Sequence, residues 1–131
     1  MNVLMAYSES TSVPCVFESQ PASAKILVAE DPFVSTFLRT VLQKHGHKVM
    51  TGDAVRTSEL LRQGSVAADM VITNRPEVFL EFAGMLPMLY IAAAPDQDLA
   101  SKFAICRVLR KPFRNDDLLA AVEQLADSVV P

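Results

Sequence analysis

The sequence predicts an α/β fold in which helices cover both faces of a doubly wound parallel sheet. Two observations support this prediction. Strand-like apolar runs and amphipathic helical segments alternate five times over about a hundred residues, and this alternation is typical of parallel sheets with right-handed crossovers. Several of the strand-like runs are apolar at nearly every position, which indicates strands that are covered on both faces. At 131 residues the chain fits one such domain with a single core.

The first strand and the first helix have the clearest signals. Residues 26–29, Ile-Leu-Val-Ala, match a buried strand. Asp31 and Pro32 then match the N-cap and the first position of a helix, because Asp accepts from free backbone amides and Pro has no amide to leave unpaired. This helix should end at Gly46. Its core-facing stripe is Val34, Phe37, Leu38, Val41 and Leu42.

The remaining elements follow the same alternation. Further strands are predicted over residues 48–51, 69–74, 88–93 and 107–109. Helices are predicted over residues 54–63, where Gly64 closes the helix, over 99–103, and over 116–127, where Asn115 is the cap. Residues 75–86 have no clear period and leave room for two helical turns around Val78, Phe79 and Phe82.

Composition argues against several classes of function. The 12 basic and 15 acidic side chains leave a net charge of −3, so neither a nucleic-acid nor a membrane partner is expected. No apolar run reaches the ~20 residues that cross a bilayer, and the N-terminus does not match a signal peptide. Cys15 and Cys106 lie too far apart for a disulfide framework or a zinc site. We therefore expect a cytoplasmic protein with two reduced thiols.

The domain is predicted to cover residues 25–131. Residues 1–24 show no sustained periodicity and are predicted to be a tail ahead of it. Asn2–Tyr7 is apolar enough that an extra strand there is the alternative.

Candidate functional residues follow the predicted strands. Sites in a doubly wound sheet form at the carboxyl ends of its strands. This rule selects Glu30 and Asp31 after the first strand, Asn74 after the third, Ala92 at the fourth and Lys111 after the fifth. Adjacent carboxylates facing a lysine would suit a divalent cation and a phosphoryl group.

The chain resembles the receiver domains of two-component response regulators, the CheY-like family, from Lys25 to Ala126. Three segments carry the resemblance: Lys-Ile-Leu-Val-Ala-Glu-Asp (25–31), Asp-Met-Val-Ile-Thr-Asn (69–74) and Leu-Arg-Lys-Pro-Phe (109–113). The resemblance implies a flavodoxin-like sheet of five strands in the order 2-1-3-4-5. It also implies that an acidic pair holds magnesium, that an aspartate after the third strand takes a phosphoryl group, that a Thr or Ser ends the fourth strand, and that a lysine precedes a cis-proline.

Glu30, Asp31 and Lys111 match that pattern, but other positions depart from it. The phosphoacceptor position holds Asn74, whose amide oxygen is a poor nucleophile, and the Thr/Ser switch position holds Ala92. Val108 stands where the family has an aromatic switch residue. Asn74 and Ala92 are only 18 positions apart, which predicts a shortened third helix.

Structural explanations remain open for the matched residues. Glu30 and Asp31 could cap the first helix and pair with Lys111 without any metal, so magnesium binding at this pair is predicted to be weak at most and no other cofactor is expected. His45 and His47 flank Gly46 and are predicted to be solvated.

The sequence therefore predicts a pseudo-receiver, a module that binds a signalling protein without being phosphorylated and that is not an enzyme. Its candidate partner face is Arg107, Arg110 and Arg114, and the same face could form a homodimer. The alternative is a phosphorelay receiver that accepts phosphate at a non-standard carboxylate, Glu30 or Asp31. A flavodoxin-like small-molecule site is disfavoured because the loop after the first strand is acidic, which repels phosphate.

Overall fold

The structure, a computed structural model, describes residues 23–129. Strands and helical elements alternate along these residues, and their predicted order is confirmed with ends shifted by a few positions. The strands are β2 (Lys25–Ala29), β3 (Lys48–Thr51), β4 (Met70–Thr73), β5 (Met88–Ala92) and β6 (Cys106–Arg110). The helical elements are α1 (Pro32–Lys44), α2 (Ala54–Gln63), the 3₁₀ helix η2 (Pro76–Phe82), α3 (Gln97–Ala100) and α4 (Asn115–Val129).

The five strands form one parallel sheet in the order β3-β2-β4-β5-β6. In chain order this is 2-1-3-4-5, so the predicted topology is confirmed. The carboxyl ends of parallel strands lie along one edge of the sheet. The segments that follow β2, β3 and β4 are therefore brought together there, although they are far apart in the sequence.

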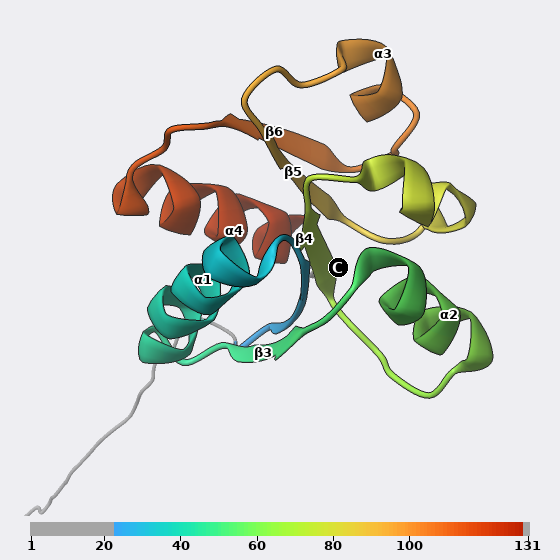
Figure 1. Cartoon of the computed structure of the whole chain (residues 1–131), viewed down its shortest axis with the longest axis horizontal. Coiled ribbons are helices and arrows are strands. Elements are labelled where there is room, and N and C mark those ends of the chain that lie inside the picture. The colour runs from blue at the N-terminus through green and yellow to red at the C-terminus, as the bar shows by residue number, and fades with distance from the viewer. Residues whose placement is uncertain (1–22, 130–131) are drawn as a thin grey trace, which may run out of the picture.

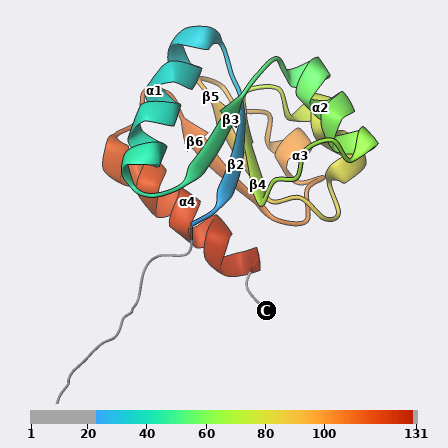
Figure 2. The same ribbon diagram turned by 90° about the horizontal axis from the view of Figure 1, so that it is seen from below.

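Helices cover both faces of the sheet (Figures 1 and 2). On one face α1 and α4 pack against a cluster built from the Ile26 and Val28 side of β2. On the other face α2, η2 and α3 pack against the Leu27 and Ala29 side. Because strand side chains alternate between faces, the continuous apolar run of β2 supplies both clusters, which explains why it shows no polar alternation.

The third helix is shortened, as predicted. Between β4 and β5 the chain forms only η2, a 3₁₀ helix interrupted at Phe79, whose φ and ψ are −108° and 17°. Phe79 itself is fully buried in the cluster on this face. One large aromatic side chain thus fills space over the sheet that the short segment leaves without a full helix.

Several predicted helix ends are confirmed and one is wrong. Asp31 caps α1, since its Oδ1 accepts from the Val34 amide at 3.1 Å. Gly64 ends α2 with φ of 77°, a left-handed conformation that favours glycine. Asn115, however, is the first residue of α4. The preceding residue, Arg114, takes the cap position because its carbonyl accepts from the Leu118 amide at 3.0 Å.

The exposure of some predicted side chains differs from the expectation. Phe37 was assigned to the core stripe of the first helix, yet it is 42% exposed and contacts Phe113, with ring centroids 6.4 Å apart. Phe33 on the same helix is 86% exposed. Leu38 and Leu42 are fully buried, and Val34 and Val41 are partly buried against the same cluster, so Phe37 is the only residue of the predicted stripe that lies mainly outside the core.

The start of the domain is well packed. Ala24 is buried and belongs to the cluster beneath α1 and α4. Residues 1–22, including the predicted extra strand over Asn2–Tyr7, lie outside the described residues, so the predicted tail stays a prediction. Within residues 23–129 no helix combines the length and hydropathy that a membrane span requires.

Candidate functional site

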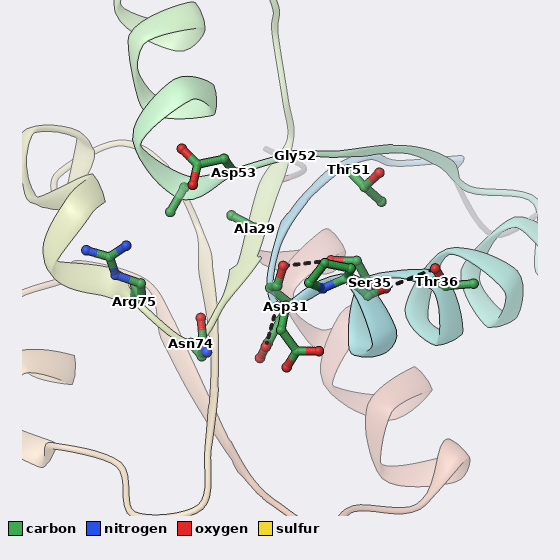
Figure 3. A pocket seen from close by; sticks show the side chains of 12 residues that line it. Ala29, Asp31, Ser35, Thr36, Thr51, Gly52, Asp53, Asn74 and Arg75 are labelled. Atoms are coloured by element: carbon green, nitrogen blue, oxygen red, sulfur yellow. Dashed lines mark hydrogen bonds between the residues drawn. The ribbon is translucent and has the colours of Figure 1, made fainter.

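A cavity of about 530 Å³ opens at the carboxyl ends of β2, β3 and β4, between the first turns of α1 and α2. Figure 3 shows Asp31 and Ser35 on the α1 side and Asp53 on the α2 side, with Asn74 and Arg75 beside them after β4. Its lining residues are Ala29, Glu30, Asp31, Pro32, Ser35, Thr36, Thr51, Gly52, Asp53, Ala54, Asn74 and Arg75. The structure thus brings Glu30, Asp31 and Asn74 together, as predicted.

Glu30 is the most enclosed charged group of the site. Its side chain is 0% exposed, and its Oε1 accepts from the Asp31 amide at 3.2 Å. The Lys111 ammonium lies 3.4 Å from Oε1 and 3.3 Å from Oε2. Burial raises the pKa of Glu30 above its usual range, although the Asp31 amide and the Lys111 charge both oppose that rise. Glu30 and Lys111 therefore form a largely buried ion pair that balances its own charge.

One carboxylate oxygen of this ion pair has no hydrogen bond within the described part of the chain. Glu30 Oε2 is buried and makes no hydrogen bond to any described residue, because Lys111 meets it at ion-pair distance without hydrogen-bond alignment. Lys111 is 28% exposed on its side chain, so it also retains contact with solvent. The Lys111–Pro112 peptide bond is cis, as the resemblance implied.

Asp31 has a structural task in addition to lining the cavity. One of its carboxylate oxygens, Oδ1, is used by the cap of α1, and the residue as a whole is exposed. Ser35 adds to the same turn because its hydroxyl donates to the Glu30 carbonyl at 3.1 Å. The polar side chains of Asp31 and Ser35 therefore stabilise the N-terminus of α1.

Asn74 lines the cavity at the end of β4 and is partly exposed. The residue before it, Thr73, is fully buried, and its hydroxyl donates to the Ala29 carbonyl at 2.8 Å and accepts from the Arg75 amide at 3.0 Å. Thr73 thus ties the ends of β2 and β4 together. The sequence argument did not identify this role, although a Thr at a fully buried strand end was the available signal.

Ala92 and Val108, which the resemblance places at switch positions, lie outside the cavity lining. Ala92 ends β5, and its carbonyl accepts from the Lys111 amide at 3.0 Å. Its methyl group offers no hydroxyl for a bound anion. Val108 lies on β6 and packs against the cluster under α2 and α3, where it provides an apolar contact only.

The residues present do not fit the magnesium ion that the receiver resemblance implies. Mg²⁺ favours several oxygen ligands, usually carboxylates and waters. Within residues 23–129 no group of three or more His, Cys, Asp or Glu side chains is placed to hold a metal. Glu30 is already paired with Lys111, Asp31 uses one oxygen for the cap, and Asn74 supplies a neutral amide.

The three predicted arginines are exposed but do not share one face. Arg107 and Arg110 lie on the edge strand β6, and Arg114 lies just before α4. Side chains alternate along a strand, so Arg107 lies on the side of Leu109, toward α4, and Arg110 lies on the side of Val108, toward α3. They are therefore not one contiguous patch.

The prediction that both histidines are solvated is wrong for His47. Its ring is buried, and Nδ1 accepts from the Ala24 amide at 3.2 Å. Burial lowers the pKa of His47, the neighbouring His45 lowers it further, and Glu123 opposes both effects. His45 is exposed, with Nδ1 3.0 Å from the Val41 carbonyl. The turn brings His47 over the start of β2, which a local reading of the sequence does not reveal.

Sequence reasoning also missed Asp53, which caps α2 by accepting from the Arg56 amide at 3.0 Å. It lines the same cavity as Asp31. Its position just before a predicted helix was the signal that could have identified it. The cavity therefore lies between two aspartate-capped helix ends.

Comparison with known proteins shows the fold. No protein-family model matches the sequence, and a search of curated proteins finds no match. Among solved structures, a response regulator receiver protein from Sinorhizobium medicae matches with a TM-score of 0.66 and 21% identity, over 85% of this chain and 99% of that one. The chemotaxis response regulator CheY4 of Vibrio cholerae matches with 0.66 and 20%, over 79% and 99%.

A larger protein gives the same result. NtrX from Brucella abortus, in a complex with ADP, matches with a TM-score of 0.68 and 21% identity. The match covers 82% of this chain but only 27% of NtrX. These neighbours show that the chain has the fold of response regulator receiver domains.

Proposed function

We propose that this receiver-fold domain acts in signal transduction as a protein-interaction module that does not depend on phosphorylation, and that it is not an enzyme. One observation carries the proposal: the residue that follows β4 at the edge of the cavity is Asn74. A side-chain amide is neutral and weakly nucleophilic, so it does not form an acyl phosphate at a useful rate.

Glu30 does not replace the missing acceptor. Its side chain is fully buried and faces Lys111 at 3.3 Å. A phosphodonor would have to reach the carboxylate through the surrounding protein and separate it from its counter-charge. This geometry supports a structural role, in which the ion pair joins the loops after β2 and β6.

Two side chains that would respond to a bound phosphoryl group are also missing. Ala92 has no hydroxyl to hydrogen-bond a phosphoryl oxygen, and Val108 is an apolar packing residue. A phosphoryl group bound here could not hydrogen-bond Ala92, so it could not draw the loop after β5 toward itself. The proposal is therefore that the domain presents one constitutive surface to its partner.

Asp31 is the residue on which the alternative function depends. It is exposed, it lines the cavity, and only its Oδ1 is engaged in the cap of α1. In this alternative the second oxygen of Asp31 attacks the phosphorus of a phosphodonor such as acetyl phosphate, forming an acyl phosphate on Asp31 while the bond from phosphorus to the donor oxygen breaks and acetate leaves. The Asp31 position differs from that of Asn74, so the two proposals can be separated by mutation.

The test uses the purified protein with Mg²⁺ and acetyl phosphate, followed by intact mass, and in parallel with beryllofluoride, followed by amide NMR. The expected result for the wild type is no gain in mass and no shifts near Asn74. The matched variant Asn74→Asp restores a carboxylate at the acceptor position and should gain one labile phosphoryl group.

A phosphorylated wild type would overturn the proposal. If Asp31→Asn then abolished the modification, the alternative would stand. Partner capture gives a second readout, because Arg107→Glu and Arg110→Glu probe opposite sides of β6. Binding that survives both substitutions and Arg114→Glu would remove the predicted partner face.

A further inference from the structure

A small groove lies at the amino-terminal ends of β2 and β3, the end of the sheet away from the cavity. The register pairs Lys25 with Lys48 and Leu27 with Met50. Alternation places all four side chains on the same face of the sheet, because Leu27 belongs to the cluster on the α2 side. The segment that leads into β4 forms the opposite wall, at Val66, Ala67 and Ala68.

The groove is apolar inside and basic at its rim. Leu27 is buried at its floor, whereas Met50 is 36% exposed and is among the exposed large apolar side chains. Lys25 and Lys48 are both exposed at the rim. Asp69 is the acidic neighbour, and its Oδ2 accepts from the Lys25 amide at 2.8 Å. Two lysines against one aspartate leave the rim positive.

Size indicates what kind of group the groove takes. Its volume is about 200 Å³, which is below the roughly 300–1,000 Å³ of small-molecule sites. The groove therefore suits one apolar side chain of a polypeptide better than a free ligand. Its positive rim suits a polypeptide segment that also carries a carboxylate.

The chain itself supplies such a segment. Residues 1–22 precede the described part of the chain and contain no lysine or arginine, and their charged side chains are Glu9 and Glu18. Val16, Phe17 and Glu18 place an aromatic ring next to a carboxylate. This composition complements a groove that is apolar inside and basic outside.

The point at which this segment joins the domain is fixed beside the groove. The Ala24 amide is held by His47 Nδ1 at 3.2 Å, and the next residue, Lys25, already lines the groove. Phe17 precedes Ala24 by seven positions, which span at most about 25 Å when extended. A tether this short holds Phe17 at a high local concentration near the groove.

We propose that the N-terminal segment of this chain docks in the groove. The Phe17 ring packs against Leu27 and Met50. The Glu18 carboxylate faces Lys25 and Lys48 at the rim. This contact covers the exposed face of β3 and leaves the cavity at the other end of the sheet open, so it is independent of the proposed function.

The test places a nitroxide on Cys15 of the full-length chain in a Cys106→Ser background and measures paramagnetic broadening of amide NMR signals. Docking should broaden the amides of Met50 and residues 66–68 several-fold more than those of Phe33 and Phe37, which are exposed near the other end of the sheet. Phe17→Ser should abolish this difference. Tyr7→Ser, which removes the other aromatic residue of the segment, should leave it unchanged.

A mixed sample identifies the occupant. Spin-labelled chains without ¹⁵N are combined with unlabelled ¹⁵N chains, so that broadening there reports contact between molecules. Groove broadening as strong in the mixed sample as in the fully labelled sample would assign the groove to the segment of a second copy and overturn the proposal. Equal broadening at the groove and at Phe33, or broadening that survives Phe17→Ser, would overturn it as well.

Discussion

Replacing Lys111 with methionine tests whether the Glu30–Lys111 pair has the structural role assigned to it. The substitution keeps most of the apolar stem, which limits lost packing, and removes only the ammonium group. Glu30 would then be a fully buried carboxylate that accepts one hydrogen bond, from the Asp31 amide. We expect the variant to fold but to be measurably less stable.

The expected loss lies between two limits. Breaking a fully buried ion pair costs about 3–5 kcal/mol, whereas exposed pairs contribute about 0–1 kcal/mol. Glu30 meets the buried limit, but Lys111 is 28% exposed and makes no aligned hydrogen bond to Oε2. We therefore expect a loss of about 2–3 kcal/mol in the free energy of unfolding at neutral pH, or roughly 10 °C in Tm.

The loss should depend on pH in a defined direction. The folded pKa of Glu30 is raised above its ordinary value of 4.5, so the folded state binds the proton more tightly than the unfolded state. The stabilisation that comes from protonation of Glu30 is therefore fully present below about pH 4.5 and is lost as the pH rises through the folded pKa of Glu30. Without Lys111 that pKa rises further, so the difference between variant and wild type should be small near pH 4 and largest at about pH 7.

Urea unfolding at about pH 4 and about pH 7 provides the measurement. The matched double variant Glu30→Gln, Lys111→Met removes both charges and should recover most of the stability lost at neutral pH. A Lys111→Met variant as stable as the wild type at neutral pH would refute the reasoning. An equal loss at both pH values would also refute it, because the effect would then come from packing.

Three further predictions concern stability. Gly64 has φ of 77° with open space around its Cβ position, so Gly64→Ala should cost about 1 kcal/mol in urea unfolding. Gly84 has the same open space but no positive φ, so Gly84→Ala should cost little, and equal costs would contradict this. Asp53→Ala should lower the free energy of unfolding by about 1 kcal/mol, measured by thermal unfolding, because it removes the cap on the Arg56 amide. Asp53→Asn keeps a side-chain oxygen for this cap and should retain most of the stability. The pKa of His47 is lowered from 6.5, so the wild type should lose stability as the pH falls below about 6.5; a His47→Gln variant with the same pH slope would contradict this assignment.

Much of the fold could be predicted because its signals are local. The apolar run of β2, the Asp31 cap and the Gly64 stop each act within a few residues of their position in the chain. The alternation of strands and helices then restricts the topology, since crossovers are right-handed and parallel. The edge of the sheet that holds the cavity could be predicted as well, because the carboxyl ends of parallel strands meet there.

Exposure and contact were harder to predict. Phe37 follows the helical period of the core stripe, but the orientation of α1 on the sheet leaves it half exposed against Phe113. His47 occupies a polar turn, yet its ring is buried over Ala24. Arg107 and Arg110 are close in sequence, but the pleat of β6 turns them to opposite faces.

The sequence by itself determined the order of the elements, the amide side chain at Asn74 and the short connection to β5, because residue identity and spacing are properties of the chain. Only the tertiary structure decided what Glu30, Asp31 and Lys111 contact. Glu30 and Lys111 are 81 positions apart, and no local signal states that the carboxylate is buried or that the ammonium reaches it. Asp31 and Asp53 likewise share a cavity only because parallel pairing of β2 and β3 brings their helix ends together. Burial and charge balance arise from contacts between distant segments, and these contacts exist only once the sheet has formed.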